Sequence, residues 1–181
     1  IGARQGPDAI RVQSSLVRPY YPPDFDFNPL ELLNLVDCGN VACVAGEVES
    51  ALSMIETAVS EICQTGAVPV TMGGDGLVSL PQLRALSKVH NDLVFIHIDA
   101  HTDTYPSSGS RTNDLYNTAT TFTRAAEEQL IDTTRSFHIG ARGTLTVPGV
   151  FDHTRKQGYQ LIDGDTLNAR GIADVLAELH D

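Results

Sequence analysis

The sequence predicts an α/β fold in which a mostly parallel sheet carries helices on both faces. Short apolar runs alternate with longer segments of helical periodicity, a pattern typical of parallel strands joined by crossover helices. Two polar stretches, 73–76 and 99–103, directly follow apolar runs. Open parallel sheets bind ligands at the carboxyl ends of their strands, so both stretches lie where a site is expected. With 181 residues the chain has room for a real core, and we predict one domain over 1–181.

The first third of the chain contains one well-defined helix. Pro7 suits the first turn of a short helix, the proline-rich segment 19–29 is expected to be irregular, and 32–37 is expected to form a short strand. From 47 to 64, apolar residues recur at steps of four and three, which places them on one helix face, and Gly66 ends the helix. The apolar stripe consists of Val48, Leu52, Ile55, Val59 and Ile62.

Beyond Gly66, strands and helices alternate. Strands are expected at 67–72, 93–98, 136–141 and 159–162. Helices are expected at 79–89, 121–130 and 166–179. Residues 104–117 are rich in Ser, Thr, Asn and Gly and are expected to form a long loop over the strand ends, where functional loops often lie. Residues 144–158 are expected to be irregular.

The stretch that follows the apolar run 93–98 contains the candidate metal ligands. Asp99, His101 and Asp103 follow one another at intervals of two residues. In extended backbone such residues project from one side, and two carboxylates with an imidazole are suitable ligands for a divalent transition metal. The alternative is a strand that ends in a solvated turn, with His101 bonded to a neighbouring backbone group. His97 lies on the same face and is expected to be a buried, hydrogen-bonded core residue or, alternatively, a substitute ligand.

Four stretches, in order along nearly the whole chain, resemble motifs of the arginase/agmatinase (ureohydrolase) family. Residues 2–7 resemble the family's G-A-R-x-G-P element, and 73–76 resemble its G-G-D-H. Residues 99–103 match D-A-H-x-D, and Thr104 extends the match to the D-A-H-T-D-T form of agmatinase-like members. Residues 138–143 resemble the later I-G-x-R-G strand.

The resemblance implies a three-layer, arginase/deacetylase-like α/β fold and a two-metal centre that usually holds Mn²⁺. In that family a hydroxide bridging the metals attacks the guanidinium carbon and releases urea and an amine. The implied substrate is a small cationic guanidino compound, agmatine-like or a guanidino acid. Carried over to this chain, Asp99 would bridge both metals, His101 would bind one and Asp103 the other. Asp75 would support the site.

Two residues depart from the family pattern. Gly76 stands where the family has a metal-binding His, so the second metal position lacks its imidazole. Thr118 stands where the family has a catalytic His, and a threonine hydroxyl does not titrate near neutral pH. No catalytic residue is therefore predicted. These departures motivate an alternative function, a catalytically silent homologue that acts as a structural or regulatory partner in an oligomer.

The two ends of the chain and its overall charge complete the expectations. The chain begins at Ile1, and the family's later aspartate-rich strand is not found, so we expect the sequence to be incomplete at both ends. The net charge of −11, without any Lys/Arg-rich run, argues against nucleic-acid and membrane partners. Three cysteines without a zinc pattern fit a reducing cytoplasm. The family resemblance further implies a homo-oligomer, a trimer or a hexamer.

Overall fold

The computed structural model describes residues 2–20, 24, 26–107 and 115–180, and the predicted loop 104–117 therefore lies partly outside them. Backbone contacts divide the chain into two compact units. The first consists of Ile1–Ala42 with Val70–Asp75, and the second of Cys43–Pro69 with Gly76–Asp181. The single domain remains a prediction.

The first unit contains short helices. They are the 3₁₀ turn η1 (Ala3–Gln5), α1 (Gly6–Ser14) and α2 (Pro29–Leu32). From α1, Arg11 donates from Nε to Asp37 Oδ2 at 2.7 Å, which fixes α1 against the segment that follows α2. A β-carbon at position 74 would lie 1.8 Å from the carbonyl oxygen of Ala3, so only glycine fits there. Two of the family-like motifs therefore pack against each other.

Two predicted strands are wrong. The segment 32–37 begins at the end of α2, whose first turn is set by the Asn28 side chain accepting from Leu30 N and by Pro29. The segment 67–72 is not a strand either. Apolar residues raise strand propensity, but a strand also needs a paired neighbour for its backbone groups, and neither segment is paired in the described residues.

The second unit contains a parallel sheet in the order β1-β2-β3. Its strands are β1 (Ile96–Ile98), β2 (Phe137–Ala141) and β3 (Gln160–Asp163). Its helices are α3 (Val48–Gln64), α4 (Ser79–Leu86), α6 (Thr121–Glu127), α7 (Val150–Lys156), α8 (Gly164–Arg170) and α9 (Ile172–His180). The short 3₁₀ turns are η2 (Gly76–Val78), η3 (Thr118–Thr120) and η4 (Thr133–Arg135).

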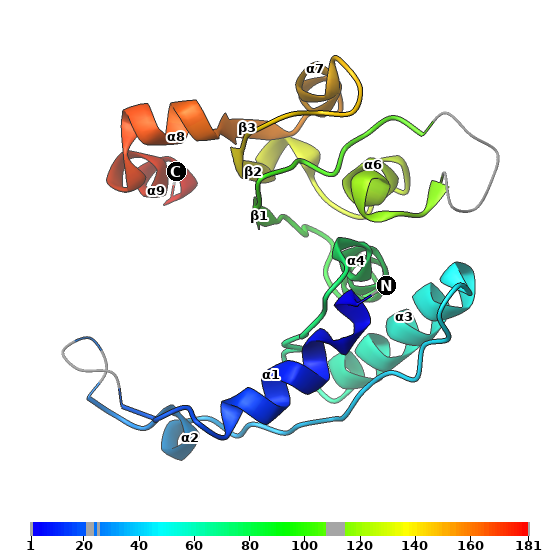
Figure 1. The fold of residues 1–181 in the computed structure, drawn as a ribbon, viewed down its shortest axis with the longest axis vertical. Coiled ribbons are helices and arrows are strands. Elements are labelled where there is room, and N and C mark those ends of the chain that lie inside the picture. The colour runs from blue at the N-terminus through cyan, green and yellow to red at the C-terminus, as the bar shows by residue number, and fades with distance from the viewer. Residues whose placement is uncertain (1, 21–23, 25, 108–114, 181) are drawn as a thin grey trace. The chain divides into compact units, whose positions relative to one another are not determined.

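Helices cover both faces of this sheet, as the sequence predicts. One core contains Leu80 and Leu83 of α4, Phe122 of α6 and Tyr159, with Phe95 packed against them. The other core lies on the opposite face. It is formed by Ile139, Ile162 and Val175, with Leu167 packed against them. Figure 1 shows the resulting layers, with α8 and α9 on one side of the strands and α6 on the other.

Two further expectations need correction in the C-terminal part. Residues 150–156 form α7, although 144–158 is expected to be irregular, because their sequence is too polar to show an apolar stripe. The helix expected over 166–179 is two helices, broken at Gly171, whose φ of +82° is left-handed. Asp163 begins the first of them by accepting from Thr166 N at 2.8 Å. In the described residues, no helix is both long and apolar enough to span a membrane.

Candidate active site

The carboxyl end of β1 is held in place by β2. Asp99 N donates to the carbonyl oxygen of Ile139 at 3.2 Å, and Arg142 N donates to the carbonyl oxygen of Ala100 at 2.8 Å. These two hydrogen bonds continue the parallel pairing beyond the last residue of β1. The D-A-H-T-D segment therefore begins on a rigid strand end, as predicted.

Asp99 and His101 lie side by side. Asp99 Oδ1 accepts from the backbone N of His101 at 2.9 Å, and His101 Nδ1 lies 3.5 Å from the same oxygen. Their side chains are 43 % and 53 % exposed, so both are accessible to a ligand from solvent. Two of the three predicted ligands are thus brought together.

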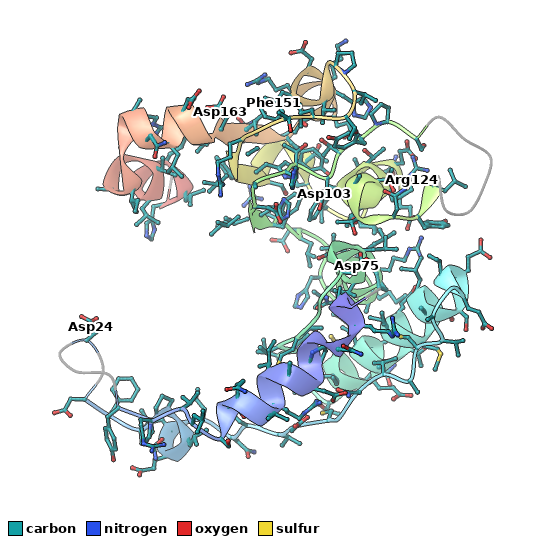
Figure 2. All side chains as sticks on the ribbon, in the orientation of Figure 1. Asp24, Asp75, Asp103, Arg124, Phe151 and Asp163 are labelled. Carbon is teal, nitrogen blue, oxygen red and sulfur yellow. The ribbon has the colours of Figure 1, made fainter. Side chains whose placement is uncertain are left out.

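Asp103 is held differently. Its φ of +50° is left-handed, so the extended backbone assumed from the sequence does not continue to this residue. It is only 6 % exposed, and its carbonyl oxygen accepts from Phe122 N at 3.0 Å. Figure 2 marks Asp103 and, on neighbouring α6, Arg124. A non-glycine residue in this conformation persists only where its surroundings hold it there.

A cluster of buried threonine hydroxyls surrounds this turn. Thr104 Oγ1 lies 2.7 Å from Thr102 Oγ1 and 2.5 Å from Thr154 Oγ1 of α7. Thr154 also donates to the carbonyl oxygen of Val150 at 2.9 Å. His153, next to it on α7, bonds the carbonyl oxygen of Thr104 through Nδ1 at 2.7 Å. The missed helix α7 is therefore the element that fixes the second half of the motif.

The two residues that depart from the family pattern are in contact with each other. A β-carbon at position 76 would lie 2.8 Å from Thr118 Cγ2 and 3.3 Å from Asp103 Oδ2. A side chain at 76 would thus point into the space beside the Asp103 carboxylate, and the Thr118 methyl group partly fills that space. The two departures occur at one place beside Asp103.

Behind Asp99 the sheet carries a pair of imidazoles. His97 and His138 face each other across β1 and β2, with their Nδ1 atoms 3.0 Å apart. On the other side of its ring, His97 Nε2 lies 3.7 Å from Asp99 Oδ2. Burial lowers the pKa of both, that of His138 to about 3, with a further lowering from His97. His97 is hydrogen-bonded and partly buried, which agrees with the structural role expected for it.

Sequence reasoning identified His97 but missed its partnership with His138. The missing information was the strand register, since only the alignment of β1 with β2 places the two rings together. The same holds for Thr154, which lies far along the chain from Thr102 and Thr104.

The possible metal donors are unevenly distributed over the motif. Asp99 and His101 offer a carboxylate and an imidazole on one side, and both are ligand types for a divalent transition metal. At the other end, Gly76 supplies no donor beside Asp103. In the described ranges, no three His, Cys, Asp or Glu side chains are grouped closely enough to hold a metal. The assignment of Asp99, His101 and Asp103 as ligands therefore stays a prediction, as does the supporting role of Asp75 in the first unit.

The second unit has a parallel sheet between two helical layers, and its Asp- and His-containing segment lies at the carboxyl ends of the strands. Open α/β proteins bind their ligands at this edge of the sheet. Comparison with known proteins specifies the group further. The chain belongs to the arginase family, whose family model matches residues 1–181.

Curated relatives align with nearly the whole of this chain. It is 33% identical over 180 residues to a guanidinobutyrase from Pseudomonas aeruginosa, covering 99% of this chain and 55% of the relative. It is 33% identical over 181 residues to an agmatinase from Photorhabdus laumondii, again covering 99% of this chain and 55% of the relative. The chain thus spans about half the length of the curated relatives that it matches.

Solved structures agree on the fold. The proclavaminate amidino hydrolase from Streptomyces clavuligerus matches with a TM-score of 0.85 and 26% identity, over 99% of this chain and 58% of that one. A hypothetical agmatinase from Burkholderia thailandensis matches with a TM-score of 0.83 and 28% identity, over 98% and 53%. These matches confirm the arginase-like fold expected from the sequence.

Proposed function

We propose that the protein is a metal-dependent amidinohydrolase that cleaves a guanidino compound, agmatine-like or a guanidino acid, to urea and an amine. The observation that carries the proposal is the D-A-H-T-D-T segment at the carboxyl end of β1, where Asp99 and His101 lie together and exposed. The names of the relatives, guanidinobutyrase and agmatinase, support this substrate class.

The residues of this chain would hold the metal unequally. Asp99 and His101 would bind Mn²⁺, an ion also present in a solved relative, a Trypanosoma cruzi formiminoglutamase of the same fold. When bound, Mn²⁺ supplies Lewis acidity and lowers the pKa of a coordinated water. Asp103 would hold the second position without help from residue 76, so that position would bind more weakly.

The charge of the chain and its family support the remaining parts of the proposal. A net charge of −11 is compatible with a cationic guanidino substrate. A homo-oligomer, trimeric or hexameric, and a cytoplasmic location are proposed from the family resemblance and from the unpaired cysteines Cys38, Cys43 and Cys63.

A second candidate function is a silent homologue that serves as a structural or regulatory oligomer partner. The observation that favours it lies beside Asp103. There the Thr118 methyl group occupies the space into which a metal-binding side chain at position 76 would extend. Asp99 and His101 speak against it, since their exposure leaves them available to a ligand.

The test is metal content and urea release by the complete protein, equilibrated with excess Mn²⁺ and then desalted. Agmatine and 4-guanidinobutanoate are the substrates to assay, and His90→Gln is a control variant because His90 is exposed and outside the site. Bound Mn²⁺ with urea release from either substrate supports the enzyme. If the protein binds no Mn²⁺ and releases no urea, the proposed enzyme is overturned and the silent homologue is favoured.

A further inference from the structure

Beneath the exposed pair Asp99 and His101, a second pair of histidines is enclosed by aromatic rings. His138 is 0% exposed, and its ring centroid lies 5.1 Å from Phe95, 5.2 Å from Phe122 and 4.8 Å from Tyr159. The Tyr159 hydroxyl does not reach it, because it donates to the carbonyl oxygen of Phe122 at 2.7 Å. The only polar contact of the ring is the Nδ1 atom of His97, and Nε2 has no hydrogen-bond partner in the described residues.

This geometry restricts where the ring protons lie. Two Nδ1 atoms at 3.0 Å need one proton between them, so one ring donates and the other accepts. If His138 kept its proton on Nε2, that N–H would be buried without an acceptor, which is costly. If the proton is on Nδ1, it is donated to His97, and Nε2 is left as an acceptor without a partner, so this arrangement makes the one hydrogen bond that the ring can form without burying an unpaired N–H.

The position of the His138 proton then fixes that of His97. Because His97 accepts at Nδ1, a neutral His97 ring carries its proton on Nε2, the atom that lies 3.7 Å from Asp99 Oδ2. The N–H dipole therefore faces the carboxylate. At that distance the contact is electrostatic rather than a hydrogen bond. The other carboxylate oxygen, Oδ1, already accepts from the backbone of His101.

We propose that His97 and His138 form a proton-ordered pair that holds the Asp99 carboxylate from behind, which makes the fully buried His138 a positioning residue for the site. His97 transmits the constraint across the sheet, and His138 fixes the tautomer of His97. The consequence for binding rests on the proposed function, but the proton order itself does not. An imidazole that orients a ligating carboxylate acts as the outer partners of metal ligands generally do.

The first test is the tautomer of each ring, from ¹⁵N chemical shifts of the complete metal-free protein labelled at histidine. The expected result is a protonated Nδ1 on His138 and a protonated Nε2 on His97. A protonated Nε2 on His138 would overturn the proposal. This readout does not depend on metal binding, so it stands whether or not the proposed function fails.

The second test is Mn²⁺ affinity measured by titration of three variants. His138→Phe removes the donor and should weaken binding about 10-fold, whereas His138→Gln keeps an N–H donor and should stay within about threefold of the parent. Tyr159→Phe is the matched control, because it removes a buried hydroxyl from the same aromatic cluster without touching the imidazole pair. Equal losses in His138→Phe and Tyr159→Phe would reduce His138 to a packing residue and overturn the proposal.

The two proposals fail in distinguishable ways. If Asp99→Asn left Mn²⁺ affinity unchanged, Asp99 would not be a ligand and the metal site of the proposed function would fail. The tautomer experiment would still decide whether the histidine pair is ordered.

Discussion

Asp99 and Asp103 belong to one short motif, but the chain holds them in opposite ways. Asp99 follows a paired strand and is 43 % exposed; its carboxylate accepts from His101 N, and His97 Nε2 lies 3.7 Å away. Asp103 is 6 % exposed and left-handed, and it is constrained through its backbone and through neighbouring threonines. The first end of the motif is thus open to solvent, whereas the second end is closed and fixed by packing.

The two departures from the family pattern are both at the closed end. Gly76 and Thr118 meet beside the Asp103 carboxylate and leave the Asp99 end untouched. Changes at Asp99 should therefore alter ligand binding with little cost to folding. Changes around Asp103 should cost stability first, because buried polar groups there depend on each other.

The largest effect is expected at the open end. Asp99→Asn should lower Mn²⁺ affinity by more than about 100-fold, since loss of a ligand costs more than loss of an outer partner. The free energy of unfolding should change by less than about 1 kcal/mol, because the residue is exposed and Asn can still accept from His101 N. Isothermal titration and urea unfolding measure the two quantities.

Asp92→Asn is the matched control for that variant. Asp92 is exposed and lies before β1, so it should change neither affinity nor stability. A large loss of stability in Asp99→Asn would contradict the separation of an open end from a closed end.

The next effect is expected in the threonine cluster. Thr154→Val keeps the shape of the side chain but removes the hydroxyl that bonds Thr104 and the Val150 carbonyl oxygen. Buried hydroxyls would lose their partner, and the free energy of unfolding should fall by about 2 kcal/mol. Thr57→Val is the control, because the Thr57 hydroxyl also bonds the carbonyl oxygen four residues earlier but is exposed. Equal effects in the two variants would show that the cluster adds nothing.

An effect of similar size concerns pH and the imidazole pair. Unfolding returns His138 from a pKa of about 3 to its ordinary value near 6.5, so below pH 6.5 the unfolded chain binds a proton that the folded chain does not. Stability should therefore decrease as the pH falls, by about 2 kcal/mol between pH 7 and pH 5. His97, whose pKa is also lowered, adds to the loss in the same direction.

Urea unfolding at the two pH values measures this slope. His138→Phe should remove most of it, whereas His90→Gln, at an exposed position, should leave it unchanged. An unchanged slope in His138→Phe would mean that the buried imidazole does not resist protonation.

The sequence predicts best those parts whose signal is local. The apolar stripe 48–62 places α3 within one residue of its observed start, because helix periodicity needs no distant partner. The strands β2 and β3 are also predicted within one residue at each end. The segments 32–37 and 67–72 fail because an apolar run does not reveal whether a neighbouring strand exists to pair with it.

In the candidate site, too, the features with a local signal are predicted and those that need a distant segment are not. The pairing of Asp99 with His101 follows from spacing alone, and the D-A-H-T-D-T resemblance identifies the segment. Spacing does not predict the left-handed turn at Asp103 or its proximity to Gly76 and Thr118. Both depend on segments that the fold brings together. Sequence spacing therefore locates the open end of the motif, and only tertiary contacts define the closed end.

The smallest effect sharpens the comparison at the closed end. Gly76→Ala places a β-carbon 2.8 Å from Thr118 Cγ2 and should cost about 1 kcal/mol of stability through overpacking. Thr118→Ser removes that methyl group, so the double variant should recover most of the loss, and a double-mutant cycle by urea unfolding gives the coupling. Gly2→Ala is the control, because a β-carbon there meets nothing within 4 Å.

A coupling near zero would mean that the two positions do not compete for space. If the coupling is found, Gly76→His combined with Thr118→Ser is the variant that tests the closed end as a second metal position. The β-carbon that carries the new imidazole would lie 3.3 Å from Asp103 Oδ2. We expect it to bind more Mn²⁺ per chain than the parent, whereas Gly76→His alone, obstructed by Thr118, should not.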